Sequence, residues 1–342
     1  MRRANEAALA GLTRDIAVRD GIRAAVAASV ARAYFESHAL ERQITLLERL
    51  HAMRIDDLDL QRTRLTAGLT SPYDYEQARS ETAAVAAQLP ALRAAHARAL
   101  TALAVLRGVS PAQMFAEWSD LAPADRGAAA LPAAPTVPMD LPSALLERRP
   151  DIRAAEQQLV ASTARIGQAK AAYFPRLSLT GVLGGVSTAL SSLFDASSRA
   201  WQAGAVVTQP LTDLNRVGAN VAAAKALTHA ATARYARTVQ VAFEETLNAL
   251  TGVTTAREIM QAQDERVSAL QNAYRTAETQ YRAGSLGYLE LLDVERQLRE
   301  VEQQQVNAHL ALLQSTVDLY RALGGGWQEA PPVAAVDRAP PD

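Results

Sequence analysis

The chain has 342 residues, a formal net charge of −1, 49% hydrophobic residues and only 5% aromatic residues. No excess of basic residues points to nucleic acid, and the absence of cysteine excludes disulfides, thiol catalysis and thiolate metal sites. No run of about 18 apolar residues is present, so we expect no transmembrane helix. The N-terminus also lacks the apolar core of a signal peptide. A composition rich in alanine favours long helices with closely approaching axes.

The first predicted element is one helix over residues 3–65, in which apolar residues recur at near-helical spacing and no proline occurs before Pro72. At 1.5 Å per residue it would be about 90 Å long. Because helices in proteins gain most of their stability from packing against other elements, we expect this helix to have a partner along its whole length. Its mixed-charge stretch, which we interpret as a solvated face with i,i+4 pairs, comprises Arg54, Asp56, Asp57, Asp59, Arg62 and Arg64.

A reversal follows at Gly68, where glycine supplies the positive φ that a tight turn needs. A serine N-cap and Pro72 then start a second helix, which is predicted to end at Gly108. Residues 1–107 would therefore form one helical hairpin.

Six prolines follow in residues 108–142, which we expect to be an extended connector. Residues 143–174 are predicted to be a helix that Pro150 interrupts and Pro175 ends.

The hydrophobic period changes to an alternation in residues 175–210, where we expect strands over residues 176–186 and 200–209. Each strand has about ten residues, the length of a transmembrane β-strand. On alternation alone, an ordinary hairpin in water is the alternative. The alternating leucines of the first strand are Leu177, Leu179 and Leu183.

Residues 211–323 are predicted to be a second helical hairpin, with a helix from about residue 215 to Arg282, a reversal at Gly284, and a further helix. The tail, residues 324–342, is rich in glycine and proline and is expected to be disordered. The second helix carries a heptad seam for antiparallel pairing, formed by Leu291, Val294, Leu298, Val301, Gln305, Ala308 and Leu312.

The two hairpins have the same punctuation. Gly284 lies 216 positions after Gly68 (284 − 68), and the same offset places Glu290 opposite Asp74. It also places Gly324 opposite Gly108. A gapless match of this kind indicates a duplicated helix–turn–helix unit.

No catalytic, cofactor-binding or metal-binding residue is predicted. No phosphate loop, zinc-protease motif or nucleophile elbow occurs, so we expect the chain not to be an enzyme and to need no cofactor. The five histidines never lie within four residues of one another, and we interpret each as a surface helix residue and not as a ligand. They are His38, His51, His96, His229 and His309.

One motif points to a family. The run Leu-Glu-Arg-Arg-Pro-Asp-Ile at residues 146–152 closely resembles a signature of the outer-membrane factors of tripartite efflux systems, of the OprM/NodT lipoprotein type and more distantly TolC. Further runs that resemble this family lie at residues 172–181, 281–284, 288–295 and 320–327.

The resemblance implies a mainly α fold with a small β part. Long antiparallel coiled-coil hairpins would form a periplasmic α-barrel, and a transmembrane β-hairpin would join the outer-membrane β-barrel of a homotrimer. It also implies a passive exit duct for drugs or other small molecules, located in the outer membrane with a long periplasmic extension. The implied partners are a periplasmic adaptor (membrane fusion protein), an inner-membrane RND transporter and outer-membrane lipid, with no nucleic acid.

The resemblance further implies an aperture at the periplasmic end. Leu286 stands where TolC has a linking arginine, so that link is not expected here. The family's closing ring of leucine and aspartate matches Leu289 and Asp293, and Glu290 is a nearby acidic residue. Asp74 and Tyr281 match residues that link neighbouring helices near the aperture. Gly68 and Gly284 are the helix-reversal glycines.

Residues 3–9 align with residues 217–224, just after the strand pair. The signal peptide, lipid-bearing cysteine, first helix and first β-hairpin of the family are therefore expected to be absent, and with them a conducting pore. Two alternatives remain open: a periplasmic coiled-coil adaptor or scaffold, and a TolC-like duct of type I secretion.

Overall fold

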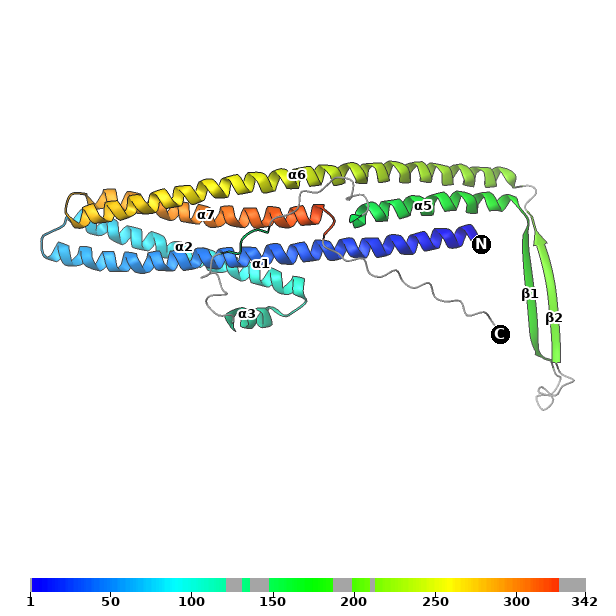
Figure 1. Ribbon diagram of the computed structural model, residues 1–342. Coiled ribbons are helices and arrows are strands. Elements are labelled where there is room, and N and C mark those ends of the chain that lie inside the picture. The colour runs from blue at the N-terminus through cyan, green and yellow to red at the C-terminus, as the bar shows by residue number, and fades with distance from the viewer. Residues whose placement is uncertain (1, 121–130, 136–147, 187–198, 210–212, 326–342) are drawn as a thin grey trace. The chain divides into compact units, whose positions relative to one another are not determined.

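The computed structural model describes residues 2–120, 131–135, 148–186, 199–209 and 213–325 (Figure 1). Within these ranges the regular secondary structure is helical apart from one two-stranded sheet, which confirms the expected mainly α fold with a small β part. Most of the helical turn expected before Pro150, and nearly all of the tail, lie outside the described residues.

Two very long helices dominate the chain. They are α1 (Arg2–Thr66) and α6 (Leu214–Arg282), of 65 and 69 residues. Each is followed by a tight reversal and a shorter helix, α2 (Pro72–Arg107) or α7 (Tyr288–Ala322). The prediction of two helical hairpins is confirmed.

The two reversals have the same backbone geometry. Gly68 and Gly284 have φ angles of 69° and 76°. In both, the glycine N–H donates to the carbonyl three residues earlier, and the next N–H donates to the carbonyl five residues before it. The same pair of bonds recurs at the far ends of the hairpins, at Gly108 and Gly324. Equal geometry at positions 216 residues apart supports the internal duplication.

The helices after the reversals also begin alike. At α2, the Ser71 hydroxyl accepts from the Asp74 N–H at 3.1 Å, and the Asp74 carboxylate accepts from the Ser71 N–H at 3.4 Å. At α7, the Glu290 carboxylate accepts from the Gly287 N–H at 2.9 Å. Because glycine has no side chain, α7 has only this half of the reciprocal cap.

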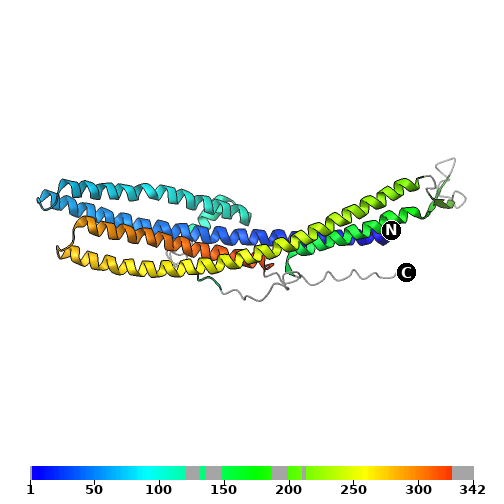
Figure 2. The same cartoon turned by 90° about the horizontal axis from the view of Figure 1, so that it is seen from above.

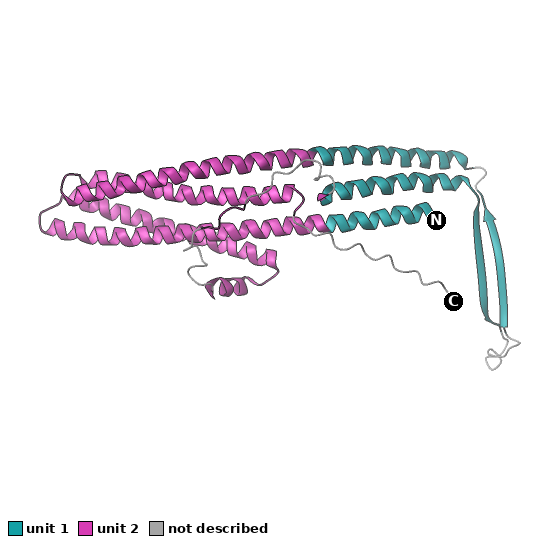
Figure 3. Cartoon of the chain, viewed as in Figure 1, with its two compact units in different colours: residues 1–19, 150–240 teal, residues 20–149, 241–342 magenta. Residues whose placement is uncertain are grey.

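The described structure divides into two compact units that cut across the chain order (Figure 3). Unit 1 comprises Met1–Arg19 and Pro150–Gln240, and unit 2 comprises Asp20–Arg149 and Val241–Asp342. The helices α1 and α6 each contribute to both units, because they are longer than the elements that pack beside them.

In unit 2, four helices lie side by side in the order α2, α1, α7, α6 (Figures 1 and 2). A hydrogen bond joins each neighbouring pair. The three bonds are Thr82 Oγ1 to the Arg54 carbonyl at 3.2 Å, Gln43 Nε2 to Asn307 Oδ1 at 2.8 Å, and Gln305 Nε2 to Asp264 Oδ1 at 2.6 Å.

Apolar side chains fill the seams between these neighbours. The α1–α2 seam is formed by Ile44, Leu47, Leu50, Val85 and Leu89. The α6–α7 seam includes Val253, Ala256, Leu312 and Leu319. The predicted stripe on α7 is confirmed at Leu298, Val301, Ala308 and Leu312. At the start of α7, however, Leu292 and Glu295 are buried in place of the predicted Leu291 and Val294.

The connector is not extended throughout. The prediction is wrong for Pro111–Asp120, which forms helix α3. The Ser110 hydroxyl accepts from the Gln113 N–H at 3.2 Å and caps this helix. Met114 and Trp118, one turn apart on α3, are buried against α1 and α2. That burial overrides the polar, proline-rich context.

In unit 1, the helix segments pack mainly through small side chains. Helix α5 (Pro150–Lys170) continues into a 3₁₀ turn, η1 (Ala171–Tyr173), and ends before Pro175 as predicted. A Cβ added at Gly167 of α5 would lie 3.0 Å from the Arg3 side chain of α1, so glycine permits this close approach. The buried alanines of α1 and α5 here are Ala7, Ala10, Ala17, Ala161 and Ala164.

The two predicted strands are confirmed as an antiparallel pair, β1 (Arg176–Gly185) and β2 (Arg199–Thr208). The register pairs Leu177 with Val207 and Leu183 with Trp201, so apolar residues gather on one face. All ten residues of each strand are exposed. Most of the loop between the strands lies outside the described residues.

Replacing Gly68 or Gly284 by alanine should destabilise the chain by about 1–2 kcal/mol, because an L side chain is strained at positive φ. An added Cβ would meet no atom within 4 Å at either position, so the backbone conformation alone sets the cost. Gly11→Ala, within α1 and equally unobstructed, is the control and should stabilise by about 0.5–1 kcal/mol. Urea unfolding followed by circular dichroism measures all three. Equal effects at the three glycines would contradict the conclusion that Gly68 and Gly284 are required for their positive φ.

Candidate functional site

The predicted aperture residues lie in the first two turns of α7, directly after the Gly284 reversal. Leu289 is 47% exposed, although leucine is an apolar residue. Asp293 follows four positions later on the same face of the helix and is also exposed. The chain therefore presents an apolar and an acidic side chain together on a surface that no described residue covers.

Asp293 has partners on its own helix. Arg296 Nη2 donates to one carboxylate oxygen at 2.6 Å, and Gln297 Nε2 donates to the other at 2.7 Å. The hydrogen bond from Arg296, and after it that from Gln297, lowers the pKa of Asp293. Arg296 was not among the predicted site residues, although its i,i+3 spacing from Asp293 was visible in the sequence.

Glu290 and Asp74 both sit in the third position of a helix and bind the backbone before it. The carboxylate of Asp74 also accepts hydrogen bonds from the hydroxyls of Thr70 and Ser71, at 3.1 and 2.8 Å. The bond from Ser71 is the largest cause of the lowered pKa of Asp74. The structure does not join Asp74 to Tyr281 among the described contacts.

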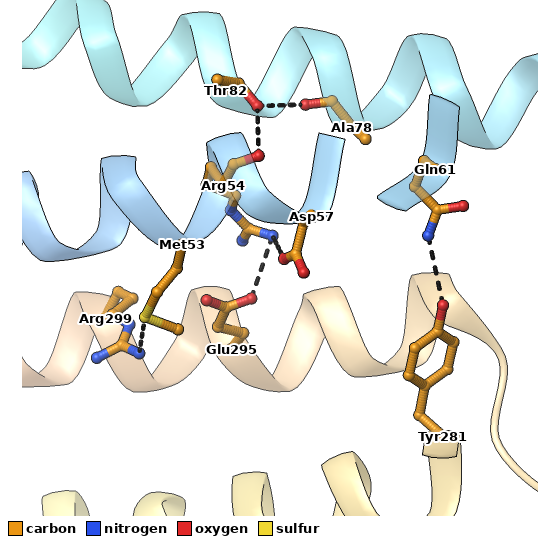
Figure 4. Close-up of polar contacts among 9 residues, drawn as sticks. All are labelled: Met53, Arg54, Asp57, Gln61, Ala78, Thr82, Tyr281, Glu295 and Arg299. Atoms are coloured by element: carbon orange, nitrogen blue, oxygen red, sulfur yellow. Dashed lines mark hydrogen bonds and ion pairs between the residues drawn. The ribbon is translucent and has the colours of Figure 1, made fainter. Parts of the chain in front are cut away.

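Tyr281 instead joins the end of α6 to α1. Its hydroxyl accepts from Arg64 Nη1 at 2.5 Å. It also accepts from Gln61 Nε2 at 3.3 Å, as Figure 4 shows. The Arg64 guanidinium also lies over the ring, 5.5 Å from its centroid. The centroid of the Tyr288 ring is 6.0 Å from the centroid of the Tyr281 ring. These contacts hold the reversal of the second hairpin against α1.

A buried ion pair lies farther from the reversal, between α1 and α7. Arg54 Nη1 is 3.1 Å from Glu295 Oε2, and both side chains are only 4% exposed (Figure 4). Arg54 also lies 3.9 Å from Asp57. The distance is that of an ion pair, but Arg54 Nη1 and Glu295 Oε1 have no hydrogen bond in suitable geometry among the described residues. Interpreting Arg54 as part of a solvated face was wrong, since α7 covers it.

Burial dominates the electrostatics of this pair. It raises the pKa of Glu295, whereas Arg54 and Arg299 oppose the shift by favouring the carboxylate. Burial also raises the pKa of Tyr288 to about 12. Because the folded pKa of Glu295 lies above its unfolded value, ionisation of Glu295 lowers the stability of the fold as the pH rises from the unfolded pKa to the folded pKa.

These contacts position the helices relative to one another. Within the described residues, no set of three or more histidine, aspartate or glutamate side chains could hold a metal ion. The polar contacts of Arg54, Gln61 and Arg64 tie α1 to α7 and to the end of α6. The contacts with α1 therefore fix the position of the start of α7, which carries the exposed Leu289 and Asp293.

Comparisons with a family model, with known protein sequences and with solved structures all point to the same family. The family model described as "Outer membrane efflux protein" matches residues 1–109 and 141–325. The chain is 34% identical over 311 residues to the probable efflux pump outer membrane protein TtgC of Pseudomonas putida, covering 91% of this chain. It spans 63% of the length of that relative.

Solved structures with the same fold include the outer-membrane channel OprN, with a TM-score of 0.81 and 32% identity over 95% of this chain and 72% of that one. The open state of the MtrE outer membrane channel of Neisseria gonorrhoeae has a TM-score of 0.79 and 29% identity, with the same coverage.

Glu295→Leu should destabilise the chain by about 3–5 kcal/mol, because it leaves Arg54 buried without its nearest partner and arginine cannot lose its proton. Arg54→Met should cost less, since Glu295 can take up a proton. The double variant should lie within about 1 kcal/mol of the unsubstituted chain, because an apolar pair replaces the ions. Urea unfolding of all four chains measures the coupling. Additive effects would show that the pair does not interact.

Proposed function

The chain belongs to the outer membrane efflux protein family, and we propose that it forms part of a channel protomer of a tripartite, RND-type efflux pump. In this role it is a passive exit duct in the outer membrane for drugs or other small molecules, with a long periplasmic extension. The observation that carries the proposal is that the family match covers both helical hairpins and the β-hairpin.

The exposed β-hairpin supports a place in the outer membrane. Unpaired strand edges invite pairing, and in lipid they must be paired. Both strands have the length of a transmembrane strand. We propose that β1 and β2 pair with strands of neighbouring protomers in a shared trimeric barrel, with the Leu177–Val207 face toward lipid.

The single layer of four helices supports a periplasmic α-barrel. Helices α2 and α6 stand at the edges of the layer in unit 2, so each has one neighbouring helix within the layer of described helices. Val105 on α2 and Leu247 on α6 are 73% and 64% exposed. We propose that coiled-coil contacts with two further copies cover these edges and close a tunnel. A periplasmic adaptor and an inner-membrane RND transporter are the proposed partners.

The aperture is the proposed control point. Three copies of Leu289 would form an apolar constriction that resists wetting, and three copies of Asp293 an acidic ring beside it. Glu290, Asp74 and Tyr281 are proposed to hold the reversals that surround it. Arg296 modifies the earlier expectation, because its ion pair offsets part of the charge of each Asp293. The family match favours this channel hypothesis over a periplasmic adaptor.

Replacing Leu289 and Asp293 together by alanine, in a full-length protein that contains this chain, should raise the conductance of the assembled channel in planar bilayers and weaken its block by divalent cations. The expected cause is a wider and less acidic constriction. Glu300→Ala, which removes an exposed carboxylate about two turns farther along α7, is the matched control and should change neither property. Conductance that is the same in all three channels would remove Leu289 and Asp293 from the gate.

A further inference from the structure

Helix α3 is anchored to α1 and α2 by one aromatic side chain. Trp118 is 5% exposed, and its Nε1–H donates to the Glu41 carboxylate of α1 at 2.8 Å. Its ring centroid lies 4.9 Å from that of His38 on α1 and 5.5 Å from that of His96 on α2. Two imidazoles that are 58 positions apart in the sequence (96 − 38) therefore contact the same indole.

Both imidazoles are poorly placed to bind a proton. The Nε2 atoms of His38 and His96 are buried and have no hydrogen-bond partner among the described residues. A proton on either ring makes both of its nitrogens donors. A charged donor without an acceptor, away from water, is unfavourable. The Tyr34 ring, 4.4 Å from the His38 ring, restricts access further.

The charges around the indole come from three helices. Burial is the largest effect and lowers the pKa of both His38 and His96. Glu41 opposes it in both cases, whereas His96 adds to it at His38. Helix α3 itself carries two charged side chains. Glu117 pairs with Arg107 of α2 at 2.6 Å, and Asp120 is exposed.

We propose that His38, His96 and Trp118 form a proton-operated clasp that holds α3 while both imidazoles are neutral and releases it when they are protonated. His38 and Glu41 are three positions apart on α1, so an imidazolium at His38 competes with the indole N–H for the same carboxylate. When Glu41 turns to His38, the indole loses its acceptor. Charge on His96 then adds repulsion between the two imidazoles.

The direction of the pH dependence follows from the burial. Because the folded pKa of each histidine lies below its unfolded value, opening the clasp takes up protons. The docked state is therefore favoured above the ordinary histidine value of 6.5 and is lost as the pH falls through the lower folded values. All of these contacts lie within unit 2, so the clasp does not depend on the proposed efflux function.

The test uses the full chain with Trp201→Phe and Trp327→Phe, so that Trp118 is the remaining tryptophan. Its fluorescence is followed from about pH 8 to pH 5, the range in which histidine changes charge. We expect a reversible red shift with its midpoint below 6.5 as the indole becomes exposed to water. His38→Gln with His96→Gln should abolish the shift. His51→Gln, elsewhere on α1, should leave it unchanged.

Three outcomes would overturn the clasp. They are no red shift in this range, a shift that persists in the double histidine variant, and loss of helical circular dichroism over the same pH range, which would indicate general acid unfolding. If the double variant does not fold at pH 8, Glu41→Gln decides. Its amide can still accept from Trp118 but cannot attract a proton to His38, so the midpoint should fall. An unchanged or raised midpoint contradicts the proposal.

Discussion

A helix of 65 or 69 residues is stable only if other helices cover it along its length. The rest of the structure follows from this requirement. Helices α2 and α7 return beside α1 and α6 and bury their apolar stripes, and α5 covers a further stretch. The glycine reversals fix where each return begins. Alanine and glycine let the axes approach closely, which explains a stable helical assembly with only 5% aromatic residues.

The seams between the helices contain polar groups that an apolar core would not need. The ion pair of Arg54 and Glu295 is desolvated, so it adds little net stability. We infer that it contributes specificity, because another alignment of α7 on α1 would leave Arg54 buried without Glu295 beside it. The histidines beside Trp118 make the packing of α3 depend on their charge. In both places the packing is conditional, since it depends on the charge state of a few side chains.

The β-hairpin follows a different rule. It has no core of its own, and a two-stranded sheet is marginal in water. Its apolar face and free edges become favourable only in lipid and beside further strands. Membership of the outer membrane efflux protein family gives this element its explanation, because the part of the chain that looks unstable alone is the part that assembly would complete.

The sequence by itself determined where the backbone turns. The breaks at Gly68 and Gly284, the alternation of the strands, the duplication and the family could all be read from it, because these depend on local conformational preferences and short motifs. Only the tertiary structure decided which charges are buried. Arg54 and Glu295 lie among other ionisable residues, and nothing local distinguishes them. Because α7 packs against α1 on one side and α6 on the other, its buried stripe starts one position later than a two-helix seam predicts, and this shift places Glu295 inside.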